Sequence, residues 1–179
     1  MLKGFIAGVV AVCLAMGAGA LFVVETGSYD VRASTPHFRP VAWGAHTTMI
    51  HASERGAATV TAPGHFTVPE IRAGFALYDK DCVTCHGGPG IDRAAWVSGM
   101  NPSPPWLIDT PRSFSAAQLY WIVDNGVKMT GMPSWAAVHN EGQIWDIVAF
   151  LEAQPYLTRT QYLRMRAMAG ARTSSRAGR

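Results

Sequence analysis

The sequence DCVTCH, from Asp81 to His86, places two cysteines three residues apart and a histidine directly after the second. Residues at spacings of three and four share one face of a helical turn, so both thiols and the imidazole can reach one bound group. A thioredoxin-like redox pair would need a βαβ context, which the sequence does not show, and a zinc site would need further ligands. No cysteine follows Cys85, and His139 stands alone, so the pattern favours covalent attachment of haem over a chance pair of small buried side chains.

A second stretch, GVKMTGMPSW, follows downstream and contains two methionines before a proline. The order C-x-x-C-H, a helix, and then G-M-P before a last helix resembles a class I monohaem cytochrome c. Within that family it looks most like the single-domain modules related to the haem subunit of cbb3-type oxidases, over approximately residues 68–154. The resemblance implies one haem c held by thioethers from Cys82 and Cys85. His86 is then the proximal iron ligand and Met132 the distal one, and methionine at that position raises the reduction potential.

Two other methionines compete with Met132 for the iron. Met129 lies three residues earlier and could face the same ring, whereas Met100 follows the haem motif too closely to pass comfortably around the porphyrin edge. Pro133 stiffens the loop and cannot continue a helix, which suits a loop that carries a ligand. Methionine most often serves only in core packing. Met132 is nevertheless the predicted distal ligand, and an open sixth position on the iron is the alternative.

The stretch GGPGIDRAAWVSGMNPSPPWLIDTP after the haem motif is rich in glycine and proline and is predicted to be a loop. In the family, such a loop wraps the proximal side of the haem, and one backbone carbonyl accepts the ring N–H of the proximal histidine. Pro104 or Pro105 is our candidate for that carbonyl. Trp106, like Trp96 and Trp135, could shield the porphyrin or bind a propionate, and hydrophobic packing is an equally good interpretation of each.

Helical periodicity in the remaining segments predicts an all-α haem domain over residues 69–154, with the class I cytochrome c fold implied by the resemblance. The first helix begins at Pro69, and Gly74 leaves room for close approach by another helix. A second helix runs from a Ser115 cap to Gly126, and Asn140 caps the last helix. A domain of this size has a small core, so covalent haem would supply apolar mass and the apo-chain should be poorly folded.

The N-terminal region carries no charge between Lys3 and Glu25, and about 20 such apolar residues span a bilayer as a helix. We therefore predict one uncleaved membrane anchor over residues 1–24, within which Cys13 is an ordinary apolar side chain. Cleavage of a signal peptide after Ala20 is the alternative. Both interpretations place the haem domain outside the cytoplasm. The family implies the periplasmic face of the bacterial inner membrane.

The segment 25–68 is predicted to be a periplasmic linker that contains a helix from about Pro40 to Gly56, capped by Ser34 or Thr35. Four histidines lie in this segment, and we interpret them as solvated or partner-contacting because no two of them pair with an acidic or sulfur cluster; haem or copper ligation by one of them is the alternative. They are His37, His46, His51 and His65.

The C-terminal segment 155–179 carries six arginines and no acid, which makes it a basic tail. Such a tail can contact anionic lipid headgroups or an acidic partner surface. A disordered, solvated segment is the alternative interpretation.

The predicted function is single-electron transfer by a membrane-anchored c-type cytochrome rather than catalysis, because the sequence shows no catalytic triad, carboxylate pair or phosphate loop. The expected partners are a dehydrogenase or quinol-oxidising complex as donor, a terminal oxidase as acceptor, and the bilayer; nucleic acid is not expected. A tightly bound subunit of a larger oxidoreductase is the alternative. A haem sensor or peroxidase with a labile sixth ligand is a further one.

Overall fold

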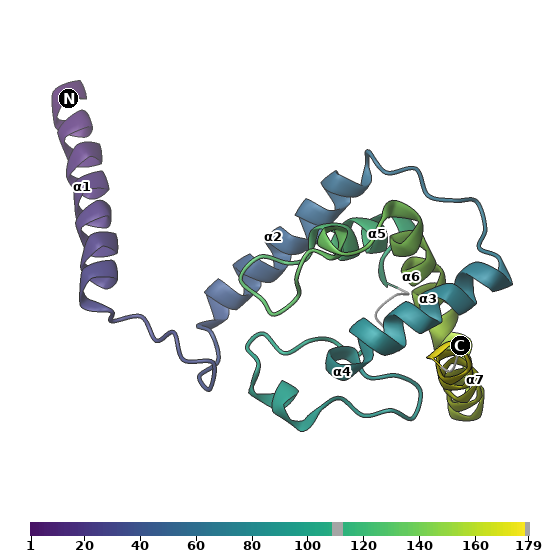
Figure 1. The fold of residues 1–179 in the computed structure, drawn as a ribbon. Coiled ribbons are helices and arrows are strands. Elements are labelled where there is room, and N and C mark those ends of the chain that lie inside the picture. The colour runs from purple at the N-terminus through teal and green to yellow at the C-terminus, as the bar shows by residue number, and fades with distance from the viewer. Residues whose placement is uncertain (109–112, 178–179) are drawn as a thin grey trace. The chain divides into compact units, whose positions relative to one another are not determined.

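A computed structural model describes residues 1–108 and 113–177, and these residues fold mainly into helices (Figure 1). None of them belongs to a β-strand. The predicted all-α class is therefore confirmed. The chain divides into two compact units, residues 1–35 and 36–179.

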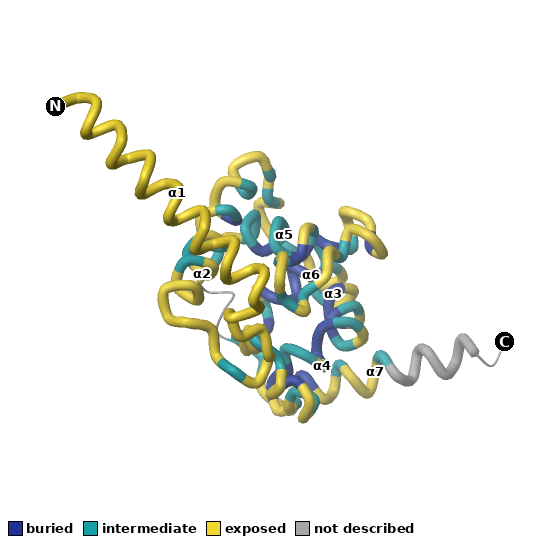
Figure 2. Tube along the Cα trace, turned by 90° about the vertical axis from the view of Figure 1, so that its left-hand side faces the viewer, coloured by how far each residue is buried: buried dark blue, intermediate teal, exposed yellow. Residues whose placement is uncertain are grey.

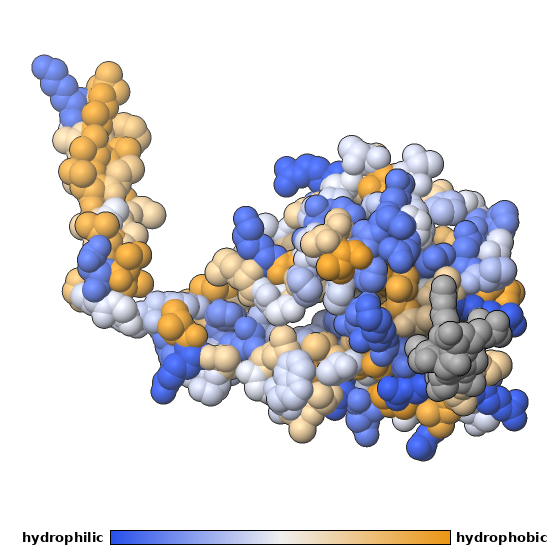
Figure 3. All heavy atoms as spheres, in the orientation of Figure 1, coloured by the Kyte–Doolittle hydropathy of each residue, from blue (hydrophilic) through white to orange (hydrophobic). Residues whose placement is uncertain are grey.

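Helix α1 (Leu2–Thr26) makes up most of the first unit. It ends at Gly27, whose φ of 61° is one that glycine adopts without steric cost. None of its residues is buried, and its surface is mostly apolar (Figure 3). The helix is long and apolar enough to cross a membrane, which is the pattern of an anchor and also of a signal sequence.

Helix α2 (Arg39–Ala57) confirms the helix predicted in the linker, with each end within one residue of the prediction. The predicted cap is wrong: neither Ser34 nor Thr35 caps the helix, and the N-cap residue is Phe38, whose side chain makes no capping hydrogen bond. Pro40 accounts for this start, since proline presets the backbone for a first helical turn and has no N–H that needs a partner there.

The two ends of α2 differ in their surroundings. Near its C-terminal end, Gly56 lies so close to the indole of Trp121, in α5 (Ala116–Asn125), that a Cβ at this position would overlap the ring. At the other end, large apolar side chains are exposed, namely Phe38, Val41 and Trp43. The C-terminal end of α2 is therefore packed on the domain, whereas its N-terminal end exposes apolar side chains.

Three helices form the core of the second unit: α3 (Val68–Asp81), α5, and α6 (Glu141–Ala153). Each begins with a capping box, in which the cap side chain accepts from the third helical residue and that residue's side chain accepts in return. The boxes pair Thr67 with Glu70, Ser115 with Gln118, and Asn140 with Gln143. The two predicted caps, Ser115 of α5 and Asn140 of α6, are confirmed, as is the end of α5 at Gly126.

Helices α3 and α6 cross at Gly74, where the Asp146 carbonyl occupies the space that a Cβ would need. The predicted close approach of another helix at Gly74 is confirmed. The crossing buries apolar residues of both helices, visible as dark segments in Figure 2. The large buried side chains among them include Phe75, Tyr78, Ile144, Ile147, Val148 and Phe150.

Helix α7 (Arg159–Ala177) occupies the segment predicted to be a basic tail. Tyr162 is 0% exposed, and its ring packs edge-on against Phe75 with centroids 5.2 Å apart. Its hydroxyl donates to Oδ1 of Asp79 at 3.3 Å, and the other carboxylate oxygen, Oδ2, accepts from Nε of Arg166 at 3.1 Å. The core therefore continues past residue 154, and the start of the basic segment is a docked helix rather than a disordered one.

Candidate cofactor site

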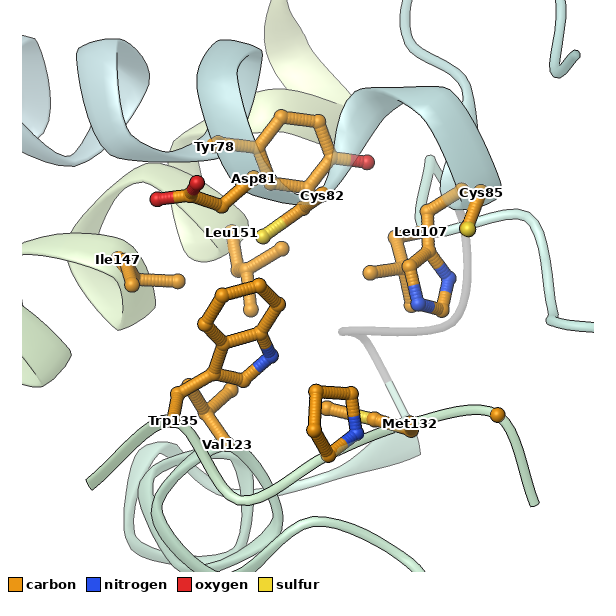
Figure 4. A pocket seen from close by; sticks show the side chains of 13 residues that line it. Tyr78, Asp81, Cys82, Cys85, Leu107, Val123, Met132, Trp135, Ile147 and Leu151 are labelled. Atoms are coloured by element: carbon orange, nitrogen blue, oxygen red, sulfur yellow. The ribbon is translucent and has the colours of Figure 1, made fainter. Parts of the chain in front are cut away.

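An apolar pocket of about 60 Å³, partly open to solvent, lies between α3, the short helix α4 (Val83–His86), and the loop after α5 (Figure 4). The wall formed by α3 and α4 carries Cys82, Cys85 and His86, and the opposite loop carries Met132. Most of the other lining residues are apolar, and they come from α5, α6, the short helix η3 (Trp135–Ala137), the loop after α5 and the loop that contains Leu107. They are Leu107, Val123, Gly131, Pro133, Trp135, Ile147 and Leu151, with Tyr78 and Asp81 from α3.

One helical turn brings the two thiols and the imidazole to the pocket. The backbone N–H groups of Cys85 and His86 both donate to the Cys82 carbonyl, at 3.1 and 2.9 Å. Both cysteines are free thiols in the structure. Burial raises the pKa of Cys82 to about 12, with Asp81 as a smaller contribution, so this thiol is protonated at neutral pH.

The imidazole of His86 is oriented by the proximal loop. Its Nδ1 lies 2.9 Å from the Pro105 carbonyl, which can only accept, so Nδ1 carries the proton. Burial lowers the pKa of His86, so the ring is neutral at neutral pH and Nε2 keeps a lone pair for a metal. Of the two carbonyls considered from the sequence, Pro105 is the acceptor. The Pro104 carbonyl accepts from Nη1 of Arg93 instead.

The loop that carries Met132 is fixed at both ends. At its start, Gly126 has a φ of 67°, and a Cβ there would overlap the Pro133 backbone. Within the loop, the Val127 N–H donates to the Met132 carbonyl at 3.1 Å, and the Met132 N–H donates to Oγ1 of Thr130 at 3.1 Å. These bonds hold the Met132 side chain at the pocket.

The two competing methionines do not line this pocket. Met129 is 90% exposed. The methyl group of Met100 packs against Gly131, in the loop that carries Met132. Among the three candidates for the distal ligand, Met132 is the one that the structure places across the pocket from His86.

The three tryptophans considered from the sequence have different surroundings. Trp135 lines the pocket and stacks on His139, with ring centroids 5.7 Å apart. Trp106 does not line the pocket; it packs against Gly87 and beneath the guanidinium of Arg93. Trp96 is 60% exposed and also lies outside the pocket lining. Contact between Trp106 and a haem stays a prediction.

A buried pair that the sequence analysis missed joins the two walls of the pocket. Nε2 of His139 lies 3.1 Å from a carboxylate oxygen of Asp81, and the two side chains are 5% and 15% exposed. Asp81 directly precedes the first cysteine, and His139 follows the short helix η3 (Trp135–Ala137). The pair therefore connects the haem-motif wall to the chain beyond Met132. The sequence gave no sign that His139 pairs with Asp81, because the two residues lie 58 positions apart.

Replacing His139 with alanine is expected to destabilise the haem-loaded protein by about 1–3 kcal/mol, because the largely buried Asp81 carboxylate loses its 3.1 Å partner and keeps the longer, 3.5 Å contact with the exposed Lys80 ammonium. Denaturant unfolding measures the change. His51→Ala is the matched control, since His51 forms a 2.9 Å pair with Glu54 at side-chain exposures of 70% and 54%. That exposed pair should contribute no more than about 0.5 kcal/mol. Equal losses in the two variants would contradict a special role for the buried pair.

Residues 69–151 match the model of a family described as cytochrome C oxidase, cbb3-type, subunit III. This segment is a cytochrome c domain of the cbb3 type. The match covers α3 to α6, which includes every residue that lines the pocket. No curated protein sequence matches the chain. The family is one of electron-transfer haem proteins, and it implies haem c as the covalently bound cofactor of residues 69–151.

The residues of the cytochrome c domain fit such a cofactor. Two free thiols and an imidazole with an available Nε2 share one wall of an apolar pocket, and a thioether sulfur lies on the other wall. This donor set is suited to covalent attachment of haem and to His/Met coordination of its iron. Among the described residues, no three histidine, cysteine or acidic side chains are grouped so that they could hold another metal ion.

Proposed function

We propose that this protein is a membrane-anchored electron carrier whose single haem c is attached through Cys82 and Cys85 and coordinated by His86 and Met132. The observation that supports this most is that His86 and Met132 line opposite walls of the pocket that also holds both thiols. Since both axial positions would then be filled by side chains, no substrate could bind the iron. The protein therefore transfers electrons and is not an enzyme by itself.

The chain's own residues would set the conditions for that transfer. The Pro105 carbonyl holds the His86 ring and its proton, the Gly126–Pro133 loop presents the Met132 sulfur, and the apolar lining excludes water. When bound, the haem supplies the one-electron redox chemistry.

The proposed location is the bacterial inner membrane, with α1 as a single span and the haem domain in the periplasm. The apolar length of α1 supports the span. The proposed partners are a dehydrogenase or quinol-oxidising complex as donor and a terminal oxidase as acceptor. Retention of α1 in the mature protein can be checked by N-terminal sequencing of the protein isolated from membranes.

A second proposal is that the protein is a firmly bound subunit of a larger oxidoreductase. Two observations favour it: the matched family is described as an oxidase subunit, and the N-terminal end of α2 exposes Phe38, Val41 and Trp43. Extraction in mild detergent followed by size-exclusion chromatography separates the two proposals. A stable larger complex supports the subunit, and a lone haem protein supports the free carrier.

The proposed function predicts that Met132→Ala abolishes the sulfur-to-iron charge-transfer band of the ferric protein in the near infrared. Its reduction potential should also fall markedly, since axial ligands set haem potentials over a range of about 0.8 V. Met129→Ala is the control, because Met129 is 90% exposed and its loss should leave the band unchanged. A wild-type spectrum that is high-spin and shifts on addition of carbon monoxide would instead support a sensor or peroxidase.

A further inference from the structure

The proximal loop that supplies the acceptor for His86 has little regular structure of its own. Residues 100–108 form only bends, turns and irregular chain. Pro102, Pro104 and Pro105 have no N–H group, so they cannot donate hydrogen bonds that would tie the loop to the domain. Contacts made by other side chains therefore help to set the position of the Pro105 carbonyl.

Arg93 makes two such contacts, one on each side of Pro105. Its Nη1 donates to the Pro104 carbonyl, and its Cζ lies 4.5 Å from the ring centroid of Trp106. Because peptide groups are rigid planes, holding residues 104 and 106 leaves little freedom for the carbonyl between them. A planar guanidinium is suited to this double contact, since it can stack on an aromatic face while its edge donates a hydrogen bond.

The backbone around Arg93 is itself tied to the turn that carries His86. The next residue, Ala94, donates its N–H to the Thr84 carbonyl at 3.0 Å. Shortly before Arg93, Gly88 and Ile91 form an antiparallel bridge, with both N–H···O distances at 2.9 Å. The arginine is thus anchored to α4 at its backbone and to the loop at its guanidinium.

We propose that Arg93 is a positioning residue for the proximal ligand: it holds the Pro105 carbonyl where that carbonyl accepts the Nδ1 proton of His86. The inference rests on the proposed role of His86 as an iron ligand. A hydrogen bond at Nδ1 makes the imidazole more basic, and a more basic ligand favours ferric iron. Arg93 would therefore lower the reduction potential through geometry, whereas its positive charge alone would raise it.

The opposite signs of these two effects allow a sharp test with Arg93→Lys and Arg93→Gln in the full-length, haem-loaded protein. Lysine keeps the charge but lacks the planar fork, so it separates geometry from charge. The first measurement is hydrogen–deuterium exchange of the His86 Nδ1–H in the ferrous protein, followed by NMR. The second is the reduction potential. Arg72→Gln, at an exposed position of α3, controls for a general change in charge.

Both Arg93 variants should exchange the Nδ1 proton about tenfold faster, the factor expected for losing roughly one net hydrogen bond. The potential should rise in Arg93→Lys and rise less in Arg93→Gln, because the lost charge opposes the shift. Arg72→Gln should change neither quantity. Thermal unfolding of each variant shows whether the fold is retained.

Two results would overturn the inference while leaving the proposed function intact. One is unchanged exchange and potential in Arg93→Lys with a lower potential in Arg93→Gln, which would mean that charge alone acts. The other is a lowered unfolding temperature with unchanged exchange, which would mean a purely structural role. Absence of an iron-bound histidine with an Nδ1–H signal in the wild-type protein would contradict both the inference and the proposed ligation.

Discussion

Replacing Tyr162 with alanine is expected to destabilise the haem-loaded protein by about 3–5 kcal/mol, the usual cost of removing a large buried aromatic side chain. The ring is 0% exposed, packs edge-on against Phe75, and lies against Gly88 in the turn after the haem motif. Its loss would also leave the Asp79 carboxylate without its contact to the hydroxyl. Chemical denaturation monitored by far-ultraviolet circular dichroism measures the change.

Met168→Ala is the control for Tyr162→Ala because it lies in the same helix and is 57% exposed. Its effect should stay within about 0.5 kcal/mol, as for most surface substitutions. If Tyr162→Ala proved as mild as Met168→Ala, helix α7 would not be docked in solution, and the segment after residue 158 would be the solvated tail considered from the sequence.

The second large effect is expected at the crossing of α3 and α6. Gly74→Ala should cost about 3 kcal/mol, the upper end of the range for overpacking, because the added methyl group would occupy the place of the Asp146 carbonyl. A backbone carbonyl cannot rotate away as a side chain can, so the two helices must separate. The free energy of unfolding should fall, and the same shift should appear in the thermal midpoint.

Gly142→Ala provides the matched control for this crossing. Gly142 lies in the first turn of α6, and a Cβ there would come no closer than 3.5 Å to its nearest neighbour, the Asn140 side chain. Alanine in a helix is favoured over glycine by up to about 1 kcal/mol, so this variant should be neutral or slightly stabilised. Equal destabilisation by both alanines would show that the contact at Gly74 does not limit the approach of the helices.

The features predicted correctly from the sequence are local ones. A capping box pairs residues three positions apart, and the first turn after Cys82 brings Cys85 and His86 together. The local sequence is therefore enough to predict both features. The linker helix was predicted for the same reason. Even there, the start at Phe38 was missed, because Pro40 rather than a capping side chain defines the first turn.

The features that were missed depend on contacts between distant residues. The Asp81–His139 pair and the Arg93 contacts across Pro105 exist only once the loops are folded, and no spacing in the sequence indicates them. Tyr162 was overlooked for another reason. Six arginines dominate the composition of residues 155–179, and they concealed an apolar stripe of Tyr162, Met165 and Ala169 at helical spacing.

The packing of α3 against the last two helices has a consequence for the order of events during synthesis. The chain emerges from its N-terminus, so α3 and the thiols of Cys82 and Cys85 appear before α6 and α7, which complete the core around α3. Until those helices dock, the apolar wall behind the two thiols is unpacked and both sulfur atoms are accessible. The topology thus leaves an interval in which a cofactor could be attached before the domain closes, and α6 would then complete the pocket around it with Ile147 and Leu151.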